Sequence, residues 1–351
     1  MKNKNIVFYV AVFFVFLFFT FTALSMISFL VPLDSKENAV SVRVEIPSGN
    51  STNRISEILA ENNLIRSKLL FYFAARYPFV FGGKLNFSLK SGVYSLNTNM
   101  SMKDILIIID SGKQEFIKVS FPEGLTARKI ASILDKNKVC IFDDFMNAVK
   151  SKDLLNKYGI IAESFEGFLF PDTYFFNPSM NGLDVVEMMV KNFFSKIKQI
   201  SQLDSKNVSE FYDDIILASI VEREYRVASE APLIASVFKN RIEDGVGLYS
   251  CATIEYIITE IQGKPHPDVI TYEDLKINSP YNTYKWAGLT PTPISNPGLV
   301  ALDAAVNTPK TDYYYFTLTD ASKGIHTFSK SFKSHTKAGI QYKTKKSAVY
   351  N

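Results

Sequence analysis

The stretch LASIVEREYRVASEAPLIASVFKNR, residues 217–241, is the most informative part of this chain. Its first half belongs to a run over 213–225 that has helix-forming residues and no Gly or Pro. Apolar side chains surround most of the circumference of this predicted helix, at Ile215, Ile216, Leu217, Ile220 and Val221. A helix that is apolar on nearly all sides is buried.

Glu222 stands near the end of this predicted helix, where a neutral residue is expected. At helical spacing it shares a face with Ile215 and Ala218, so we expect its carboxyl group to lose water and its pKa to rise. A carboxylic acid that keeps its proton near neutral pH is the group that cleavage of a glycosidic bond needs. The alternative is that Glu222 reaches solvent or pairs with Arg226.

A second helix is predicted from Ser229-Glu230 to a stop at Asp244-Gly245. Its apolar stripe consists of Leu233, Val237, Phe238 and Ile242. The two helices should form a hairpin. If the pair is antiparallel, we expect Asn240 and Arg241 to come within reach of the neighbourhood of Glu222.

The amino-terminal segment predicts a membrane anchor. Lys2 and Lys4 precede an uncharged run over 6–33 that is long enough to cross a bilayer. The run continues past the faint cleavage site at Ala23-Leu24-Ser25, so we expect a single span that is not removed. The lysines before the span and Asp34 after it predict a cytoplasmic amino terminus in the cell (inner) membrane, with the rest of the chain outside the cytoplasm.

The rest of the chain has the composition of a globular protein. Of its 351 residues 47% are hydrophobic, which is enough for cores in two or three domains. The formal charge of +4 comes from lysines near the carboxyl end, so we expect no nucleic-acid partner. Cys140 and Cys251 are too few for a disulfide framework, and the histidines lack ligand spacing, so neither a metal nor a cofactor is expected.

A strand-turn-helix pattern occurs twice. The strand-like segment 40–46 continues into IPSGNSTNRISEIL, where Gly49 makes a turn and Ser51 is a candidate N-cap. FPEGLTARKIASIL repeats this pattern 75 residues later, and the matched pairs are Pro47/Pro122, Gly49/Gly124, Ser51/Thr126, Ile55/Ile130, Ile58/Ile133, Leu59/Leu134 and Asn62/Asn137. A constant offset indicates two related units.

Between the two copies, residues 89–94 predict a turn into a strand, and 101–110 predict a helix with Ser101 as its cap. Residues 40–115 should therefore form a small α+β module. Its role is open between glycan binding and a spacer that sets the height above the membrane.

After the second copy, helices are predicted over 143–158 and over 183–197. The segment between them, SFEGFLFPDTYFF, contains Glu166 and several aromatic residues around a proline. It is either a surface loop that stacks on sugar rings or a loop whose phenylalanines anchor it in a core.

Near residue 280, Tyr281, Asn282, Thr283 and Tyr284 lie between prolines. We expect an exposed polar and aromatic cluster that favours sugar binding. A helix over 299–306 and a strand over 312–319 follow.

Eight segments resemble, in this order, the endolytic murein transglycosylases, the MltG or YceG-like family. They are IPSG…ISEIL, LKSGVYSL, FPEGLTARKIASIL, FEGFLFPDTY, LASIVEREYRVASEAPLIASVFKNR, SPYNTY, GLTPTPISNPG and GIHTFS. The resemblance implies an amino-terminal anchor, a LysM-like module and a catalytic domain. That domain would cut nascent peptidoglycan strands between N-acetylmuramic acid and N-acetylglucosamine, leaving a 1,6-anhydro end.

By the family motif the essential Glu falls on Glu222, and Glu224 is the second acidic position. SPYNTY resembles the Tyr-Asn element that lines the groove of other lytic transglycosylases. The expected substrate-binding residues are Glu166, Glu224, Asn240, Arg241, Ser250, Thr253, Tyr281, Asn282, Thr283, Tyr284 and His326.

Two positions depart from the family pattern. The family often has Gln where this chain has Tyr249, and Pro-Pro where it has Thr290-Pro291. We expect these changes to affect sugar contacts more than the chemistry, because Glu222, Asn282 and Tyr284 remain.

The expected fold class is α+β. The expected parts are a cytoplasmic tail (1–5), a transmembrane helix (6–33), a linker (34–39), a LysM-like α+β module (40–115), a mixed α/β lytic-transglycosylase catalytic domain (116–345) and a tail (346–351).

In the expected reaction Glu222 gives a proton to the glycosidic oxygen and then takes one from the C6 hydroxyl of the muramic acid. The expected partners are peptidoglycan strands, the membrane and peptidoglycan synthases, and the cut should terminate strand elongation. One alternative is a muramidase in which Glu224 or Glu166 activates water, although helix residues two apart point to different faces. The other is a non-catalytic glycan-binding scaffold for wall synthases.

Overall fold

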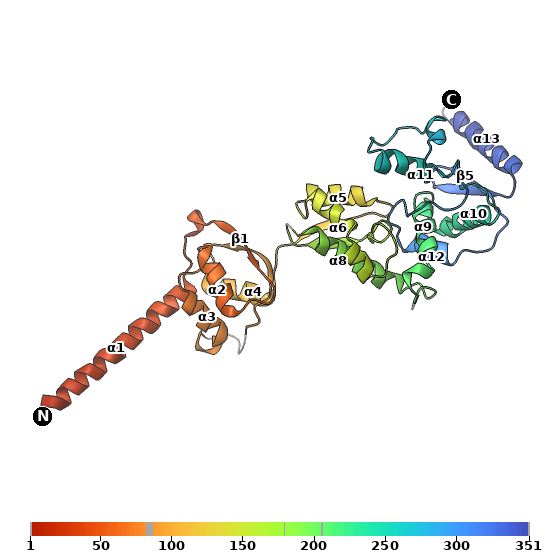
Figure 1. The fold of residues 1–351 in the computed structure, drawn as a ribbon. Helices are drawn as coiled ribbons and strands as arrows, with labels where there is room; N and C mark the ends of the chain where they lie inside the picture. Colours follow the sequence, from red (N-terminus) through yellow and green to blue (C-terminus); the bar gives the residue numbers. More distant parts are fainter. Residues whose placement is uncertain (1, 82–86, 179, 205, 350–351) are drawn as a thin grey trace. The chain divides into compact units, whose positions relative to one another are not determined.

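The structure is a computed structural model that describes residues 2–81, 87–178, 180–204 and 206–349. Parts of the predicted module (82–86) and of the two predicted tails (1 and 350–351) lie outside the described residues. The chain divides into two compact units, Met1–Ile117 and Lys118–Asn351 (Figure 1). This division falls close to the expected boundary between residues 115 and 116.

The first unit begins with α1 (Lys2–Leu30), which is a helix long and apolar enough to cross a membrane. Its segment Phe8–Leu30 has a mean hydropathy of 2.5, and of these residues Phe29 is the one buried inside the protein. α1 begins at Lys2, so it includes most of the expected cytoplasmic tail over 1–5. The expected linker is bonded to the unit, since the N–H of Asp34 donates to the Thr98 carbonyl at 3.1 Å.

A two-stranded antiparallel sheet forms the middle of the first unit. β1 (Ser41–Ile46) pairs with β2 (Gly92–Asn97), with Ile46 opposite Gly92. The helices are α2 (Thr52–Glu61), α3 (Lys68–Arg76), the 3-10 turn η2 (Pro78–Phe81) and α4 (Met102–Ser111). The predicted strands and the Ser101 cap of α4 are confirmed.

The second unit opens with the second copy of the repeat. β3 (Ile117–Ser120) pairs with β4 (Thr173–Phe176) and leads into α5 (Ala127–Lys136). Thr126 caps α5 as Ser51 caps α2, and the predicted relation between the two helices is confirmed.

The other elements of the second unit follow in chain order. They are α6 (Phe142–Val149), α7 (Lys152–Lys157), α8 (Gly182–Ile197), η3 (Val208–Glu210), α9 (Tyr212–Val221), η4 (Ala228–Glu230), α10 (Ala231–Glu243), α11 (Cys251–Tyr256), the π-helical turn η5 (Ile257–Ile261), η6 (Asp274–Lys276), α12 (Leu299–Val306), β5 (Tyr315–Asp320), β6 (Ile325–Ser329) and α13 (Phe332–Val349). β5 and β6 form an antiparallel pair.

The helix α9 lies at the centre of the second unit, packed against α12 and α10 (Figure 1). Every residue from Ile215 to Val221 is buried, which confirms the predicted buried helix. Its end is four residues earlier than Tyr225, the predicted end. In α10 the buried face is centred on Ile234, Val237 and Phe238, whereas the predicted stripe residues Leu233 and Ile242 are only partly buried.

The single helix predicted over 143–158 is wrong, because α6 and α7 are separate. The hydroxyl of Ser151 accepts a hydrogen bond from the N–H of Leu154 and begins a new helix. The Ser151 side chain caps the N-terminus of α7 and so interrupts the helix. The apolar pattern continues across this position, which is why one helix was predicted. The helices predicted over 183–197 and 299–306 are confirmed by α8 and α12, and β5 confirms the strand in its second half.

Candidate active site around Glu222

Glu222 is the C-cap residue of α9. The chain tightens there, because the N–H groups of Arg223 and Glu224 donate to carbonyls three residues back, at 3.1 and 3.0 Å. This turn ends the helix and leaves the Glu222 side chain at the edge of the core. A core helix thereby delivers a carboxyl group to a partly buried position.

Burial is the main reason why the pKa of Glu222 rises from 4.5 to about 7. The N–H of Gly298 donates to Oε2 of Glu222 at 2.8 Å, and the hydroxyl of Tyr225 also bonds to the carboxylate. Both bonds favour the ionised form, whereas the nearby negative charge of Glu123 raises the pKa. Both protonation states of Glu222 are therefore accessible near neutral pH.

The turn of the second repeat copy forms one wall beside Glu222. Gly124 has φ of +77°, and a Cβ atom there would lie 3.2 Å from Cδ of Arg223 and 3.5 Å from Cγ of Glu222. A Cβ atom on Gly298 would lie 2.7 Å from Cγ of Glu123. Glycine at both positions lets three backbone segments meet around one carboxyl group.

Glu123 is a member of this site that the sequence pattern did not reveal. Gly124 was found only as a turn former. The signal that could have revealed Glu123 is the comparison of the two copies, because Ser48 holds the corresponding position in the first one.

Asn296 holds the segments around Glu222 together, and it too was missed. Its backbone N–H donates to the Leu125 carbonyl at 2.8 Å, and its carbonyl accepts from the N–H of Gly124 at 3.0 Å. Its side-chain oxygen accepts from the N–H groups of Gly167 and Leu169, at 2.8 and 2.9 Å. One buried amide thus fixes the turn of the second copy and the loop that carries Glu166.

Ser219 ties the same region to α9. Its hydroxyl accepts from the N–H of Ile294 at 3.0 Å, and its carbonyl accepts from the hydroxyl of Ser295 at 2.9 Å. These bonds hold the loop that leads to Gly298 against the helix that leads to Glu222. Both partners of the hydrogen bond from Gly298 to Glu222 are therefore held in place by the contacts of Ser219.

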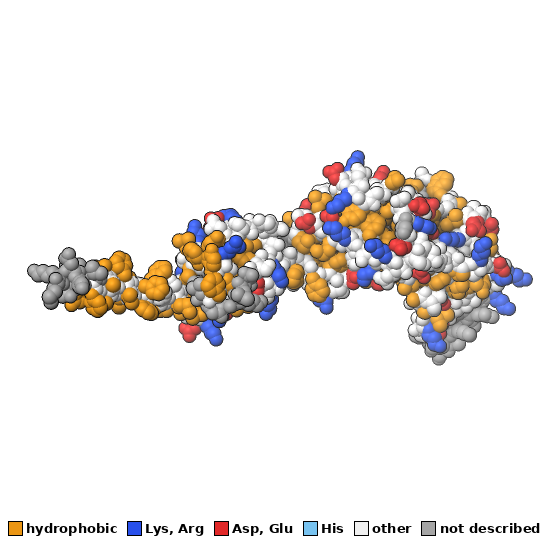
Figure 2. Space-filling view, turned by 90° about the horizontal axis from the view of Figure 1, so that it is seen from below, with side chains coloured by type: hydrophobic (Ala, Val, Ile, Leu, Met, Phe, Trp, Pro, Cys, Tyr) orange, Lys and Arg blue, Asp and Glu red, His pale blue; other side chains and the backbone are white. Residues whose placement is uncertain are grey.

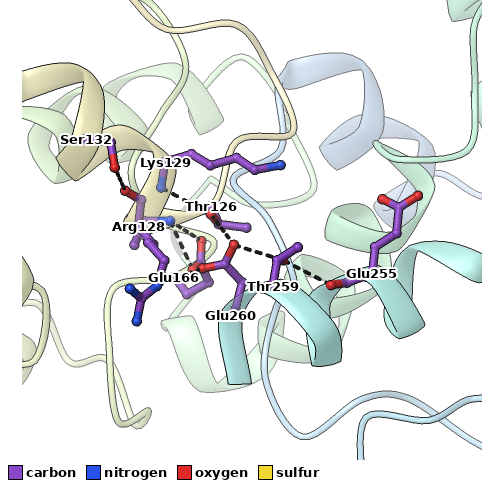
Figure 3. Close-up of polar contacts among 9 residues, drawn as sticks. Thr126, Arg128, Lys129, Ser132, Glu166, Glu255, Thr259 and Glu260 are labelled. Atoms are coloured by element: carbon purple, nitrogen blue, oxygen red, sulfur yellow. Dashed lines mark hydrogen bonds and ion pairs between the residues drawn. The ribbon is translucent and has the colours of Figure 1, made fainter. Parts of the chain in front are cut away.

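Glu166 is buried, and the surface-loop interpretation of its segment is wrong. Figure 3 shows Glu166 at the start of α5, where both of its carboxyl oxygens accept from the N–H of Ala127 at 3.0 Å. Its Oε1 also accepts from the side-chain amide of Asn296. Burial, with the charge of Glu260, raises its pKa to about 8. The alternative of a loop anchored in the core is confirmed for Phe168 and Phe170, whereas Phe175 is exposed.

Glu260 is the second carboxylate at the start of α5. It accepts a hydrogen bond from the Thr126 hydroxyl at 3.0 Å and lies 3.5 Å from Nε of Arg128 (Figure 3). Two acidic side chains therefore meet the positive end of the same helix. This arrangement fixes α5, and with it the turn that carries Glu123.

Glu224 points into a separate buried cluster. It accepts a short hydrogen bond from the hydroxyl of Ser250, and burial raises its pKa to about 7. The hydroxyl of Thr283 accepts from the N–H of Ser250 at 3.2 Å and lies 2.9 Å from that of Thr253. These residues bond to one another, and no direct bond joins the described atoms of Glu224 to Glu222.

The expected exposure of the cluster near residue 280 is wrong for its middle residues. Asn282 is 0% exposed and Thr283 is 2% exposed. The side-chain amide of Asn282 donates to the carbonyls of Leu275 and Ile277, at 2.9 and 2.8 Å, so it closes a loop. A polar side chain in a loop often satisfies nearby backbone groups, which a sequence pattern does not distinguish from ligand binding.

The aromatic residues of this cluster are partly exposed. The hydroxyl of Tyr281 lies 2.7 Å from that of Thr292. The ring of Tyr284 packs edge-on against that of Tyr249 at 5.6 Å. Tyr249 is 49% exposed and has φ of +50°, so its backbone is strained and its ring is presented to solvent.

Asn240 and Arg241 make no bond to Glu222 among the described contacts, and both side chains bond to backbone carbonyls elsewhere. α9 and α10 are antiparallel, and Nζ of Lys239 lies 3.5 Å from Asp214, at the far end of α9 from Glu222. The amide of Asn240 donates to the Thr311 and Tyr313 carbonyls, and the guanidinium group of Arg241 donates to those of Leu248 and Tyr314. The charge of Arg241 acts on Glu224 and lowers its pKa against the effect of burial.

His326 pairs with Glu230. Its Nδ1 lies 2.7 Å from Oε2 of Glu230, and its backbone N–H donates to Oε1 at 3.0 Å. Both side chains are nearly buried, so the pair joins β6 to the start of α10. Cys140 and Cys251 are free thiols, and the described residues contain no cluster of three or more His, Cys, Asp or Glu side chains able to hold a metal.

The sequence and the fold are similar to those of known proteins. The model of the YceG-like family matches residues 44–341. The endolytic murein transglycosylase of Bacillus subtilis (strain 168) is 34% identical over 333 residues, which cover 90% of this chain and 88% of that protein. The endolytic murein transglycosylase of Streptococcus pneumoniae serotype 2 is 28% identical over 337 residues, covering 87% of this chain and 59% of that protein.

A crystal structure of a yceG-like protein from Listeria monocytogenes matches with a TM-score of 0.55 and 30% sequence identity. The match covers 86% of this chain and 99% of the other. Similarity therefore extends over both the sequence and the fold.

Proposed function

The chain belongs to the YceG-like family, and on that premise we propose that Glu222 is the acid and the base of its reaction. The protein is a lytic transglycosylase that acts on peptidoglycan. The observation that supports Glu222 is its environment, a partly buried carboxyl group with a pKa of about 7 that accepts a backbone N–H. A group of this kind can both give and take a proton near neutral pH.

In the first step, protonated Glu222 donates its proton to the oxygen of the β-1,4 bond between N-acetylmuramic acid and N-acetylglucosamine. The bond from that oxygen to the anomeric carbon breaks, and the N-acetylglucosamine leaves with a hydroxyl group. Positive charge builds up on the muramic acid ring, and the new Glu222 carboxylate lies beside it.

In the second step, the Glu222 carboxylate takes the proton of the C6 hydroxyl of the same muramic acid. The C6 oxygen then bonds to the anomeric carbon and closes a 1,6-anhydro ring, and Glu222 is protonated again. The N–H of Gly298 and the hydroxyl of Tyr225 favour the ionised carboxylate between the two steps. Glu123 opposes them electrostatically and favours the return of the proton.

We assign the glycan contacts to the exposed ring of Tyr249 and the partly exposed rings of Tyr281 and Tyr284, because flat apolar rings with a polar edge suit sugar faces. The other residues of the predicted set, which are buried or partly buried, would act by holding these rings and Glu222 in place. They are Glu166, Glu224, Asn240, Arg241, Ser250, Thr253, Asn282, Thr283 and His326.

The proposal includes a place of action. α1 is consistent with a single-pass membrane anchor. With its amino end in the cytoplasm and the catalytic unit outside the inner membrane, the enzyme would meet nascent glycan strands, cut them internally and terminate their elongation beside the synthases. The small α+β architecture of the first unit supports a LysM-like module over residues 40–115, with the catalytic domain after it.

The test is mass spectrometry of the products released from purified peptidoglycan by the full-length enzyme in detergent. Anhydro ends differ from reducing ends by one water, so the proposed reaction gives the lighter product. Reducing ends would instead establish a muramidase. Equal cleavage by wild-type protein and Glu222→Gln would remove Glu222 from the mechanism.

A further inference from the structure

The helix α3 has an apolar face that no other described part of the first unit covers. Leu69, Phe73 and Tyr77 follow one another at intervals of four residues and are 70%, 50% and 46% exposed, and Phe79 in the next turn is 64% exposed. The rings of Phe73 and Tyr77 stack on each other at 6.1 Å. Four adjacent large apolar side chains form an exposed patch that normally contacts a partner or a membrane.

This face lies beside the outer end of α1. A groove of about 890 Å³ separates the two helices. Its lining residues are Phe21, Thr22, Leu24, Ser25, Met26 and Ser28 from α1, Ser67, Leu69, Leu70 and Phe73 at α3, and Tyr77 and Phe79 after it. Figure 2 shows that hydrophobic side chains along α1 continue onto the surface of the first unit.

The position of this groove along the membrane normal follows from the geometry of α1. The apolar window of α1 ends at Leu30. At about 1.5 Å per residue, Ser28 lies roughly 3 Å and Phe21 roughly 14 Å inside that end. The hydrocarbon core of a bilayer is about 30 Å thick, so this part of α1 belongs to its outer half. Side chains of α3 that line the same groove lie at the same depth.

Three contacts fix α3 and α1 in this arrangement. Phe29 of α1 is buried in the core of the first unit. The guanidinium group of Arg66, just before α3, donates to the carbonyls of Val31 and Pro32 at 2.7 and 2.6 Å, at the end of α1. The linker N–H of Asp34 is bonded to Thr98. The unit is therefore held against α1 and does not hang from a free tether.

We propose that α3 and the turn after it are inserted into the outer leaflet, with Leu69, Phe73, Tyr77 and Phe79 in contact with lipid acyl chains. The proposal rests on the proposed role of α1 as a membrane anchor. Tyr side chains such as Tyr77 are enriched at the membrane–water interface, and Lys68 and Arg76 at the two ends of α3 can reach the headgroups. An interfacial helix beside the span sets the orientation of the first unit against the bilayer.

The test places a tryptophan at chosen depths in the full-length chain. Trp286 is the single tryptophan and is changed to Phe, and Phe73→Trp is then introduced. The protein is reconstituted into vesicles of phosphatidylcholine and phosphatidylglycerol that carry a doxyl quencher near the headgroup or deep in the acyl chain. We expect Phe73→Trp to lose emission to the shallow quencher and to shift its emission to shorter wavelength.

Two further variants are the controls. Phe116→Trp lies in the same unit, where residue 116 is 49% exposed against 50% for Phe73, and it should not be quenched. Phe18→Trp lies in the middle of α1 and should be quenched by the deep label. Tyr77→Trp serves as a second reporter for α3 if Phe73→Trp folds poorly.

The outcomes separate the two proposals. If Phe18→Trp is quenched and both α3 reporters are not, α1 spans the membrane and the insertion of α3 is wrong. Equal quenching of Phe116→Trp and Phe73→Trp would likewise overturn it, because the contact would not be specific to α3. If none of the reporters is quenched, the anchor fails together with the inference built on it.

Discussion

The two copies of the strand-turn-helix unit are built alike and face different surroundings. Gly49 and Gly124 have φ of +81° and +77°, and the amides of Asn62 and Asn137 donate to the carbonyls four residues back at 2.8 Å in both copies. A Cβ atom on Gly49 would meet nothing within 4 Å, whereas one on Gly124 would meet Arg223 and Glu222. The same local structure is a turn with open space beside it in one unit and a wall of the candidate active site in the other.

The helices that follow differ in the same way. Among the described contacts, the start of α2 has the Ser51 cap alone. The hydroxyl of Ser51 accepts a hydrogen bond from the backbone N–H of Arg54. α5 has the equivalent Thr126 cap and also the Glu166 carboxyl group, bonded to the N–H of Ala127. The first copy is a stable scaffold, and the second is held in one position by buried acids from elsewhere in the chain.

The largest effect is expected at Glu222, which only the second copy contacts. Glu222→Gln keeps the shape of the side chain and removes the proton, so we expect a loss of peptidoglycan cleavage of about a hundredfold or more. Glu61→Gln on α2, with a side chain that is 64% exposed, is the control and should leave the rate unchanged. Wild-type activity of Glu222→Gln, in a protein with an unchanged circular dichroism spectrum, would contradict the assignment.

The next largest effect distinguishes Gly124 from Gly49 by the activity of their alanine variants. Gly49→Ala and Gly124→Ala both force an L-residue into the left-handed region, at about 1 to 2 kcal/mol each, so both should lower the melting temperature of their unit. Only Gly124→Ala also pushes on Arg223 beside Glu222, and we expect it to lose about tenfold in kcat/KM.

Calorimetry and turnover measured on the same preparations check this pair. Similar losses of activity in both variants would mean that rigidity of the turn, and not its contact with Glu222, is what matters.

A smaller effect is expected at the position where the two turns differ in charge, Glu123 against Ser48. The acid must be protonated at the start, so kcat/KM should fall as pH rises through the Glu222 pKa of about 7. Glu123→Gln removes a negative charge that raises this pKa and should move the alkaline limb down by less than about one pH unit.

Ser48→Glu puts the same carboxylate into the first copy and should leave the pH profile unchanged. An alkaline limb that does not move in Glu123→Gln would show that the two carboxyl groups do not interact in the working enzyme.

The smallest effect concerns the acid that caps α5. Folding raises the pKa of Glu166 from 4.5 to about 8, so the folded state holds this proton more tightly than the unfolded state. The contribution of Glu166 to the stability of the second unit should therefore be largest below about pH 4.5 and fall until about pH 8.

Glu166→Gln cannot ionise, so its melting temperature should depend less on pH over this range. Glu57→Gln on α2, whose side chain is 32% exposed, is the matched control and should keep the wild-type slope. A slope that is equal in all three proteins would show that Glu166 does not titrate on unfolding.

The elements of this protein were largely predictable because their causes are local. The apolar run of α1, the caps Ser51, Thr126 and Ser101, and the matched glycines act within a few residues of where they stand. The break between α6 and α7, where one helix was predicted, came from a local choice as well. Ser151 could point outward in one long helix or cap a second one, and the pattern of apolar residues fits both.

The burial of Glu222 also followed from the sequence, because a helix that is apolar all round carries its last residues into the core with it. The roles of the other polar residues did not follow. Asn282 bonds to the nearby Leu275 carbonyl, and Arg241 bonds to the Tyr314 carbonyl far along the chain. The sequence alone does not distinguish these polar side chains from side chains that bind a ligand.

Only the tertiary structure brought Glu123, Gly298 and Asn296 to Glu222, from segments that lie far apart in the chain. Each of these contacts depends on where a glycine lets two backbones approach and on which buried amide joins their loops. Helix and turn formation depends on neighbours in sequence, so the chain specifies it directly. The pKa of a carboxyl group depends on every charge and donor around it in space, and the packing of distant segments sets those positions.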